Sequence, residues 1–160
     1  MKKSISFFFA TYFGFGYSKI APGTVGSLMT IPLAFALGFY YGFIGLAIGV
    51  IVSFIIGVIS TTEVLKHTPH DPGFIVIDEV AGQLITFCAV GHFLQNNLRA
   101  WPLYICGFIL FRIFDIFKPQ PVRWADSKIN NAWGVMLDDI IAGVYAMLIL
   151  YIIHSFKFLY

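Results

Sequence analysis

The stretch that decides the fold runs from Val25 to Thr62 and reads VGSLMTIPLAFALGFYYGFIGLAIGVIVSFIIGVISTT, without a single charged residue. A membrane-spanning helix needs about 20 apolar residues, so this run is far too long to cross a bilayer once. Its middle, from Gly38 to Gly45, is rich in glycine and favours a turn. The stretch therefore predicts a helical hairpin with one span over about 25–39 and a second over about 43–64.

The composition of the whole chain is that of a membrane protein. Of its 160 residues, 59% are hydrophobic and 11% are charged, and the mean hydropathy is +0.85. A soluble domain carries about 25% charged residues, so much of this surface must face lipid. The net charge of +2 is too small to indicate a nucleic-acid-binding protein. The two cysteines, Cys88 and Cys106, lie in apolar stretches and lack metal-binding spacing.

Three more apolar segments complete the predicted topology, over about 75–94, 101–117 and 134–154. The N-terminal segment 5–17 would reach only about 20 Å as a helix, short of the roughly 30 Å hydrocarbon core, and predicts a short interfacial or re-entrant helix. The expected fold class is therefore all-α, a polytopic membrane helical bundle with about five transmembrane helices. Residues 1–160 are expected to form a single integral-membrane domain.

This topology gathers the charges at one membrane surface. All eight acidic residues and eight of the ten basic residues fall at the end that carries the N-terminus, and only Arg99 and Lys157 fall at the other. The positive-inside rule predicts that the charged end is cytoplasmic. Carboxylates at the ends of spans can simply reach for the nearest interface, but they also line polar cavities where they act. A polar site is the favoured interpretation, because the opposite end has no carboxylate at all.

The first two sequence blocks of the candidate site lie in the first half of the chain. The glycine-rich FGFGYS at 13–18 and APGTVGS at 21–27 include Thr24 and Ser27, whose hydroxyls could cap a helix or bind phosphate. IDEVAGQ at 77–83 begins a predicted helix with Asp78 and Glu79, and Asp71 lies in the polar loop before it. Carboxylates of this kind are hard oxygen ligands that suit Mg²⁺.

The third block, FRIFDIFKPQPVR at 111–123, places Arg112, Asp115 and Lys118 at three-residue steps, so that they share one helical face. Arginine offers a bidentate fork for phosphate and lysine a point charge. A ladder of ion pairs that neutralises itself is the alternative. Arg123 ends the block, and Asp126 follows it.

The fourth block, DDIIAG at 138–143, begins with the adjacent carboxylates Asp138 and Asp139. Neighbouring side chains point about 100° apart on a helix, so one carboxylate could bind metal while the other orients water or a basic side chain. The small Ala142 and Gly143 would let another helix pack closely.

Taken in order, the four blocks resemble the phosphatidylglycerophosphatase A family of bacterial membrane lipid phosphatases. The resemblance spans 13–143 and departs in one place, where NAWG at 131–134 replaces an expected Gly-Gly-x-Gly run. It implies a Mg²⁺-dependent enzyme that removes the terminal phosphate of phosphatidylglycerophosphate and releases phosphatidylglycerol and phosphate.

The resemblance and the charge pattern together assign expected roles. The catalytic residues would be Asp78, Glu79, Asp115, Asp138 and Asp139. All of these except Asp78, the candidate general base, would serve as metal ligands for Mg²⁺. Substrate phosphate would be bound by Thr24, Ser27, Arg112, Lys118 and Arg123. Asp71 and Asp126 would support the site.

The expected partners are phosphatidylglycerophosphate and the lipid bilayer, with no nucleic acid. The expected location is the bacterial inner membrane, as a multi-pass protein with its active site at the cytoplasmic face. The sequence leaves a homo-oligomer open. One alternative is an ion- or proton-coupled transporter, since membrane carboxylates often mark ion paths, although none is expected near mid-span. Another is a non-catalytic scaffold for lipid-synthesis enzymes.

Overall fold

The computed structural model describes residues 3–68 and 72–156, and all regular structure in these ranges is helical. In chain order the elements are α1 (Lys3–Ala10), η1 (Phe15–Tyr17), α2 (Pro22–Val64), α3 (Ile77–Thr86), η2 (Cys88–Val90), α4 (Gly91–Leu94), η3 (Leu98–Ala100), α5 (Trp101–Phe117), α6 (Val122–Lys128) and α7 (Ala132–Ser155). The predicted all-helical fold is confirmed. The short helix α6 was not predicted.

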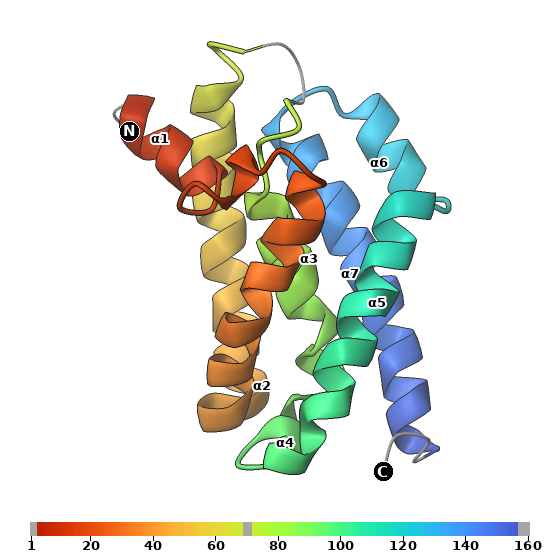
Figure 1. The fold of residues 1–160 in the computed structure, drawn as a ribbon. Helices are drawn as coiled ribbons and strands as arrows, with labels where there is room; N and C mark the ends of the chain where they lie inside the picture. Colours follow the sequence, from red (N-terminus) through yellow and green to blue (C-terminus); the bar gives the residue numbers. More distant parts are fainter. Residues whose placement is uncertain (1–2, 69–71, 157–160) are drawn as a thin grey trace.

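Helix α2 folds back on itself at Gly42. This residue has φ +58° and ψ −137°, a conformation that is open to glycine and strained for residues with a Cβ. The two halves of α2 run side by side in opposite directions (Figure 1), and a Cβ on Gly49 would lie 2.7 Å from Leu37 of the other half. The hairpin predicted within 38–45 is therefore confirmed.

Among the described residues, three helices are long and apolar enough to cross a membrane: Pro22–Val64, Leu98–Phe117 and Ala132–Ser155. The predicted spans 101–117 and 134–154 agree with α5 and α7 to within two residues. A stripe at helical spacing along the second half of α2 is more than half exposed and consists of Ile44, Ile48, Ile51, Ile55 and Ile59. Such a surface suits contact with lipid, and the chain is a helical membrane protein.

The predicted span over 75–94 is not one continuous helix. Helix α3 ends at Thr86, and the chain continues through η2 and α4. The reason lies in the hairpin of α2: Gly91 packs on the Phe43 backbone, where a Cβ would overlap it, and the Asn96 N–H donates to the Phe39 carbonyl at 2.9 Å. These contacts fold the segment against the hairpin turn, and the count of five spans is not confirmed.

Helix α3 lies inside the bundle, in contact with α2, α5 and α7 (Figure 1). Eight of its ten residues are buried. Gly82 lets α7 approach closely, since a Cβ there would lie 2.6 Å from the Asp139 carbonyl oxygen, and Gly143 packs on the Gly82 carbonyl in turn. This packing brings the acidic first turn of α3 close to Asp138 and Asp139 in the second turn of α7, beside the last turn of α5.

Candidate active site

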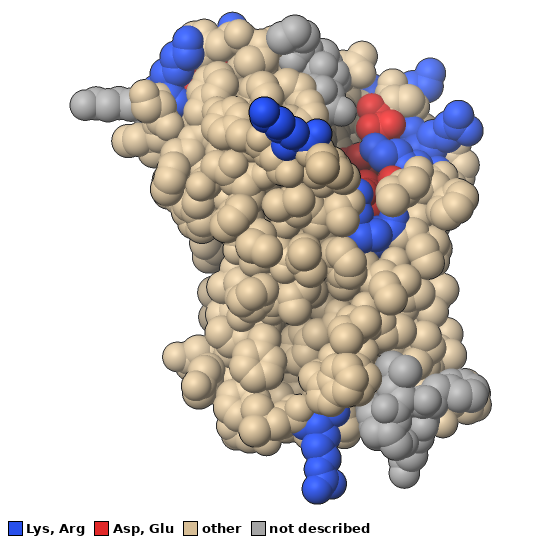
Figure 2. All heavy atoms as spheres, viewed as in Figure 1, with Lys and Arg blue, Asp and Glu red and all other residues tan. Residues whose placement is uncertain are grey.

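A cavity of about 200 Å³ lies where α3 and α7 begin and α5 ends. Figure 2 shows acidic side chains in a hollow near one end of the molecule, with basic side chains around them. The cavity is lined by Gly23, Gly73, Ile75, Asp78, Glu79, Asp115, Lys118, Asp126, Ile129, Val135, Asp138 and Asp139. Six of the eight carboxylates of the chain therefore meet in one place.

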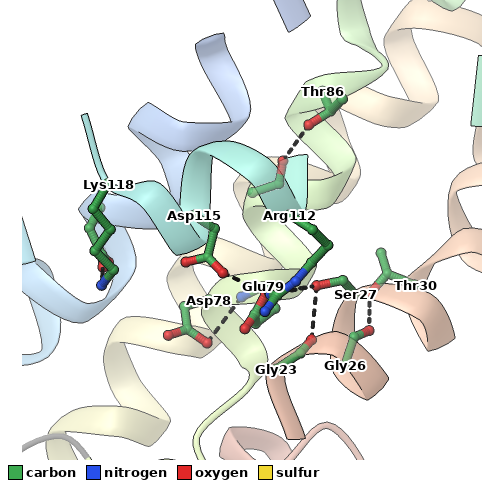
Figure 3. Close-up of polar contacts among 12 residues, drawn as sticks. Gly23, Gly26, Ser27, Thr30, Asp78, Glu79, Thr86, Arg112, Asp115 and Lys118 are labelled. Carbon is green, nitrogen blue, oxygen red and sulfur yellow. Dashed lines mark hydrogen bonds and ion pairs between the residues drawn. The ribbon is translucent and has the colours of Figure 1, made fainter. Parts of the chain in front are cut away.

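One half of the site is built around Arg112. Its Nη1 lies 2.5 Å from Glu79 Oε2 and 2.8 Å from Asp115 Oδ2. The Ser27 hydroxyl donates to Glu79 Oε2 at 2.7 Å and accepts from Arg112 at 3.3 Å. Figure 3 shows these side chains converging from α2, α3 and α5. The Arg112 cluster, defined as Ser27, Glu79, Arg112 and Asp115, thus ties three helices together at the edge of the cavity.

The other half is built around Lys118. Its Nζ lies 2.7 Å from Asp126 Oδ1 and 2.7 Å from Asp138 Oδ2, so it joins the end of α5 to α6 and α7. Burial lowers the pKa of Lys118, but its hydrogen bonds to the two carboxylates outweigh this effect and raise the pKa above its ordinary value. Lys118 therefore remains a cation at neutral pH.

The Asp139 carboxylate and one oxygen of Asp138 are left out of these ion pairs. The ion pairs of Arg112 and Lys118 use four carboxylates and leave out Asp139, which is 3% exposed. Asp138 Oδ1 is buried and has no hydrogen-bond partner in the described ranges. Asp78 Oδ1 accepts the Glu79 backbone N–H at 3.0 Å, which fixes it at the start of α3.

The cavity is lined by carboxylate oxygens, which are the donors that a hard metal ion prefers. Within the described ranges, no group of three or more His, Cys, Asp or Glu side chains is arranged to hold one metal ion. Mg²⁺, however, commonly uses only one or two carboxylates and keeps several waters. The unpartnered Asp138 Oδ1 and the neighbouring Asp139 carboxylate are oxygen donors of the kind Mg²⁺ binds, so these residues fit the ion.

The structure brings seven of the predicted site residues together in the cavity lining, and Arg112 pairs with two of these without lining the cavity itself. Ser27 contacts Glu79 and Arg112 and is not among the cavity-lining residues. Thr24 does not line the cavity either, and Arg123 is exposed on α6. Asp71 lies outside the described residues.

Gly23 is a site residue that the sequence did not identify. It lines the cavity, and a Cβ on it would overlap Glu79 Oε1 and lie 3.3 Å from Arg112 Nη1. The glycine-rich block around it does signal a close approach. However, the group that approaches the backbone is the Glu79 carboxylate.

Fold and site define a helical membrane protein with a carboxylate-rich, enzyme-like centre at one end of the bundle. A family model described as phosphatidylglycerophosphatase A matches residues 8–154. The chain belongs to the phosphatidylglycerophosphatase A family and is a phosphatase acting on lipid phosphate monoesters. The resemblance inferred from the four sequence blocks is thereby confirmed.

Curated relatives match over most of the chain. It is 40% identical to phosphatidylglycerophosphatase A of Escherichia coli (strain K12), over 90% of this chain and 80% of the relative. It is 34% identical to the Haemophilus influenzae protein of that name, over 90% and 85%. A Bacteroides thetaiotaomicron protein named "Putative phosphatidylinositol-3-phosphatase" is 37% identical, over 88% and 87%. No solved structure matches the chain significantly.

Proposed function

We propose that this protein is a Mg²⁺-dependent phosphatidylglycerophosphatase, which hydrolyses the terminal phosphate of phosphatidylglycerophosphate to phosphatidylglycerol and inorganic phosphate. The names of the Escherichia coli and Haemophilus influenzae relatives support this substrate. The observation that carries the proposal is the cavity itself, where six carboxylates and Lys118 meet at one end of an apolar bundle and Arg112 pairs with two of the carboxylates.

The charge balance of this cavity favours a divalent cation. The six carboxylates outnumber Lys118, which lines the cavity with them, and Arg112, which pairs with two of them, so ionised carboxylates leave a negative excess that would repel a phosphate dianion. Glu79, Asp115, Asp138 and Asp139 would hold Mg²⁺. When bound, Mg²⁺ would offset this charge and polarise the phosphoryl group.

The side chains of the site have complementary roles in the proposed hydrolysis. Arg112 and Lys118 donate hydrogen bonds to the phosphoryl oxygens and stabilise the charge that develops on them. Asp78 accepts a proton from the attacking water, whose oxygen joins phosphorus as the ester bond to the lipid breaks. The electron pair of the broken bond stays on the lipid oxygen, which takes up a proton from solvent and leaves as the alcohol.

The apolar flanks of α2, α5 and α7 suit a substrate whose acyl chains stay in the bilayer while its headgroup enters the cavity. Eight of the ten basic residues are expected at the end of the bundle that holds the cavity, and the positive-inside rule then supports a bacterial inner-membrane location with the cavity at the cytoplasmic face.

Phosphate release from phosphatidylglycerophosphate in detergent micelles tests the proposal. Wild-type protein should release phosphate with Mg²⁺ and lose this activity in excess chelator, and Asp139→Asn should be inactive at any Mg²⁺ concentration. Glu63→Gln is the matched control, because Glu63 pairs with Lys66 and His67 and does not line the cavity. Activity that persists in chelator would refute the role of Mg²⁺, and activity in Asp139→Asn would refute the site.

Phosphatidylinositol 3-phosphate is a second candidate substrate, because the Bacteroides thetaiotaomicron relative carries a name that specifies it. The two lipids should be compared at equal surface concentration, and preferential release from the inositol lipid would replace the first proposal. Neither the fold nor the relatives support the transporter alternative.

A further inference from the structure

Helix α3 carries a buried glutamine whose side-chain amide forms no hydrogen bond with the described residues. Gln83 is fully buried, and neither its Oε1 nor its Nε2 forms a hydrogen bond within the described ranges. It lies one helical turn beyond Glu79, so the two side chains occupy one face of α3. Since Glu79 contacts Ser27 of α2 and Arg112 of α5, that face is directed at the interface of α3 with these two helices.

Arg112 has an unpartnered group on its side of the same interface. Both of its ion pairs and its hydrogen bond to the Ser27 hydroxyl involve Nη1, whereas Nε is buried and has no acceptor in the described part of the chain. An Nε–H can only donate, so its partner must supply a lone pair. Native proteins rarely leave buried polar atoms unpaired, and internal water commonly bridges such groups.

We propose that Gln83 is a positioning residue for Arg112, which it holds through a buried water that accepts the Nε–H and donates to Gln83 Oε1. The guanidinium is then fixed both at Nη1, by the Arg112 cluster, and at Nε. This inference rests on the proposed function, in which Arg112 binds the phosphoryl oxygens.

The proposal makes a kinetic prediction that an ordinary core role does not. If Gln83 were only an unsatisfied amide, the apolar and similarly shaped Gln83→Met would be neutral or stabilising. If Gln83 positions Arg112, the same substitution removes the bridge to a charged group whose effect is greatest in the transition state. The kcat of Gln83→Met should then fall about tenfold or more, while KM stays within about twofold.

The experiment compares Gln83→Met, Gln83→Asn and Thr61→Val for lipid phosphate release and thermal unfolding. Gln83→Asn keeps the amide on a shorter side chain and should recover part of the lost kcat, because water can fill the added space. Thr61→Val is the matched control: Thr61 is also fully buried with an unpartnered hydroxyl, but it lies on α2 and takes no part in the contacts of the Arg112 cluster. Its kcat should equal that of the wild type.

Two results would overturn the assignment. The first is a wild-type kcat with a raised Tm in Gln83→Met, which would make Gln83 a core residue. The second is a parallel loss of kcat and Tm in both Gln83 variants, which would make its role structural. Absence of lipid phosphate hydrolysis by the wild-type protein would instead refute the proposed function, and with it the role of Arg112.

Discussion

Replacing Ser27 by alanine removes one hydroxyl from the centre of the Arg112 cluster. The Ser27 Oγ lies 2.7 Å from Glu79 Oε2, 2.9 Å from the Gly23 carbonyl oxygen and 3.3 Å from Arg112 Nη1. A hydroxyl has one proton, so it donates to one of the two acceptors at a time, and the charged carboxylate is the stronger. Ser27→Ala therefore leaves Glu79 with one fewer donor and less precisely held against Arg112.

The size of the effect follows from this geometry. A hydrogen bond to a charged group contributes about 1.5–3 kcal/mol, and about 1.4 kcal/mol corresponds to a factor of ten in rate. If the whole of this contribution acts in the transition state, kcat/KM falls by about 10- to 150-fold. The fold should lose less, because Arg112 still neutralises Glu79 and the small cavity left by one oxygen is minor.

Ser60→Ala is the matched control for this substitution. Ser60 is also in α2 and fully buried, and its Oγ bonds to the carbonyl four residues earlier, Ile56, at 2.7 Å. Unlike Ser27, it does not contact the Arg112 cluster. Steady-state phosphate release and thermal unfolding of both variants test whether the Ser27 hydroxyl acts through Glu79. If the two variants have equal kcat/KM, Ser27 does not act through Glu79 and the reasoning is refuted.

Three further predictions concern the same cavity. Gly23→Ala should lower kcat/KM more than about tenfold with little change in Tm, because the flexible Glu79 side chain must move away from the new Cβ. Gly73→Ala is its control: a Cβ there would meet nothing within 4 Å, and its kcat/KM should stay within about twofold of the wild-type value. Lys118→Met should lower kcat/KM at least about tenfold, whereas Lys66→Met, which breaks only an exposed ion pair with Glu63, should leave activity within about twofold. The raised pKa of Lys118 keeps its side chain charged as pH rises. The activity of Lys118→Arg should therefore fall at the same alkaline pH as that of the wild type. A fall that begins at a higher pH in Lys118→Arg would show that Lys118 deprotonates in the wild-type enzyme.

The hairpin and the two C-terminal spans could be predicted from the sequence because their signals are local. A charge-free run too long for one crossing must turn, and glycine is the residue that tolerates the backbone found at Gly42. Helix α5 ends where Lys118 and Pro119 follow an apolar run. The break in the segment 75–94 could not be predicted, because it depends on the contact of Gly91 with Phe43, far away in the sequence.

The sequence predicted which residues gather at the site more readily than it predicted which of them form ion pairs with one another. Placing all carboxylates at one end of the bundle needed only the topology, and six of them do line one cavity. The three-residue steps from Arg112 to Lys118 predicted one shared face. Lys118, however, has a left-handed backbone at φ +44°, which ends the helix, and its side chain reaches Asp126 and Asp138 of other elements. Backbone conformation at a helix end overrides side-chain periodicity.

This pairing has a consequence for how ligands enter the cavity. Arg112 and Lys118, which would bind phosphate, are both held by carboxylates, and three of those four carboxylates are proposed Mg²⁺ ligands. Phosphate that takes over the cations releases carboxylate oxygens for Mg²⁺, and Mg²⁺ that takes over the carboxylates releases the cations. The two ligands should therefore bind with mutually increased affinity, since such coupling is reciprocal.

Steady-state kinetics over a grid of lipid and Mg²⁺ concentrations measures this coupling. The apparent KM for lipid should fall as Mg²⁺ rises, and the Mg²⁺ concentration for half-maximal rate should fall as lipid rises. In Lys118→Met, where Asp138 has already lost its cation, the coupling should weaken, because one carboxylate no longer needs to be released. Binding of lipid and Mg²⁺ that is independent in the wild type would show that the ion pairs persist in the working enzyme, and would contradict this exchange of partners.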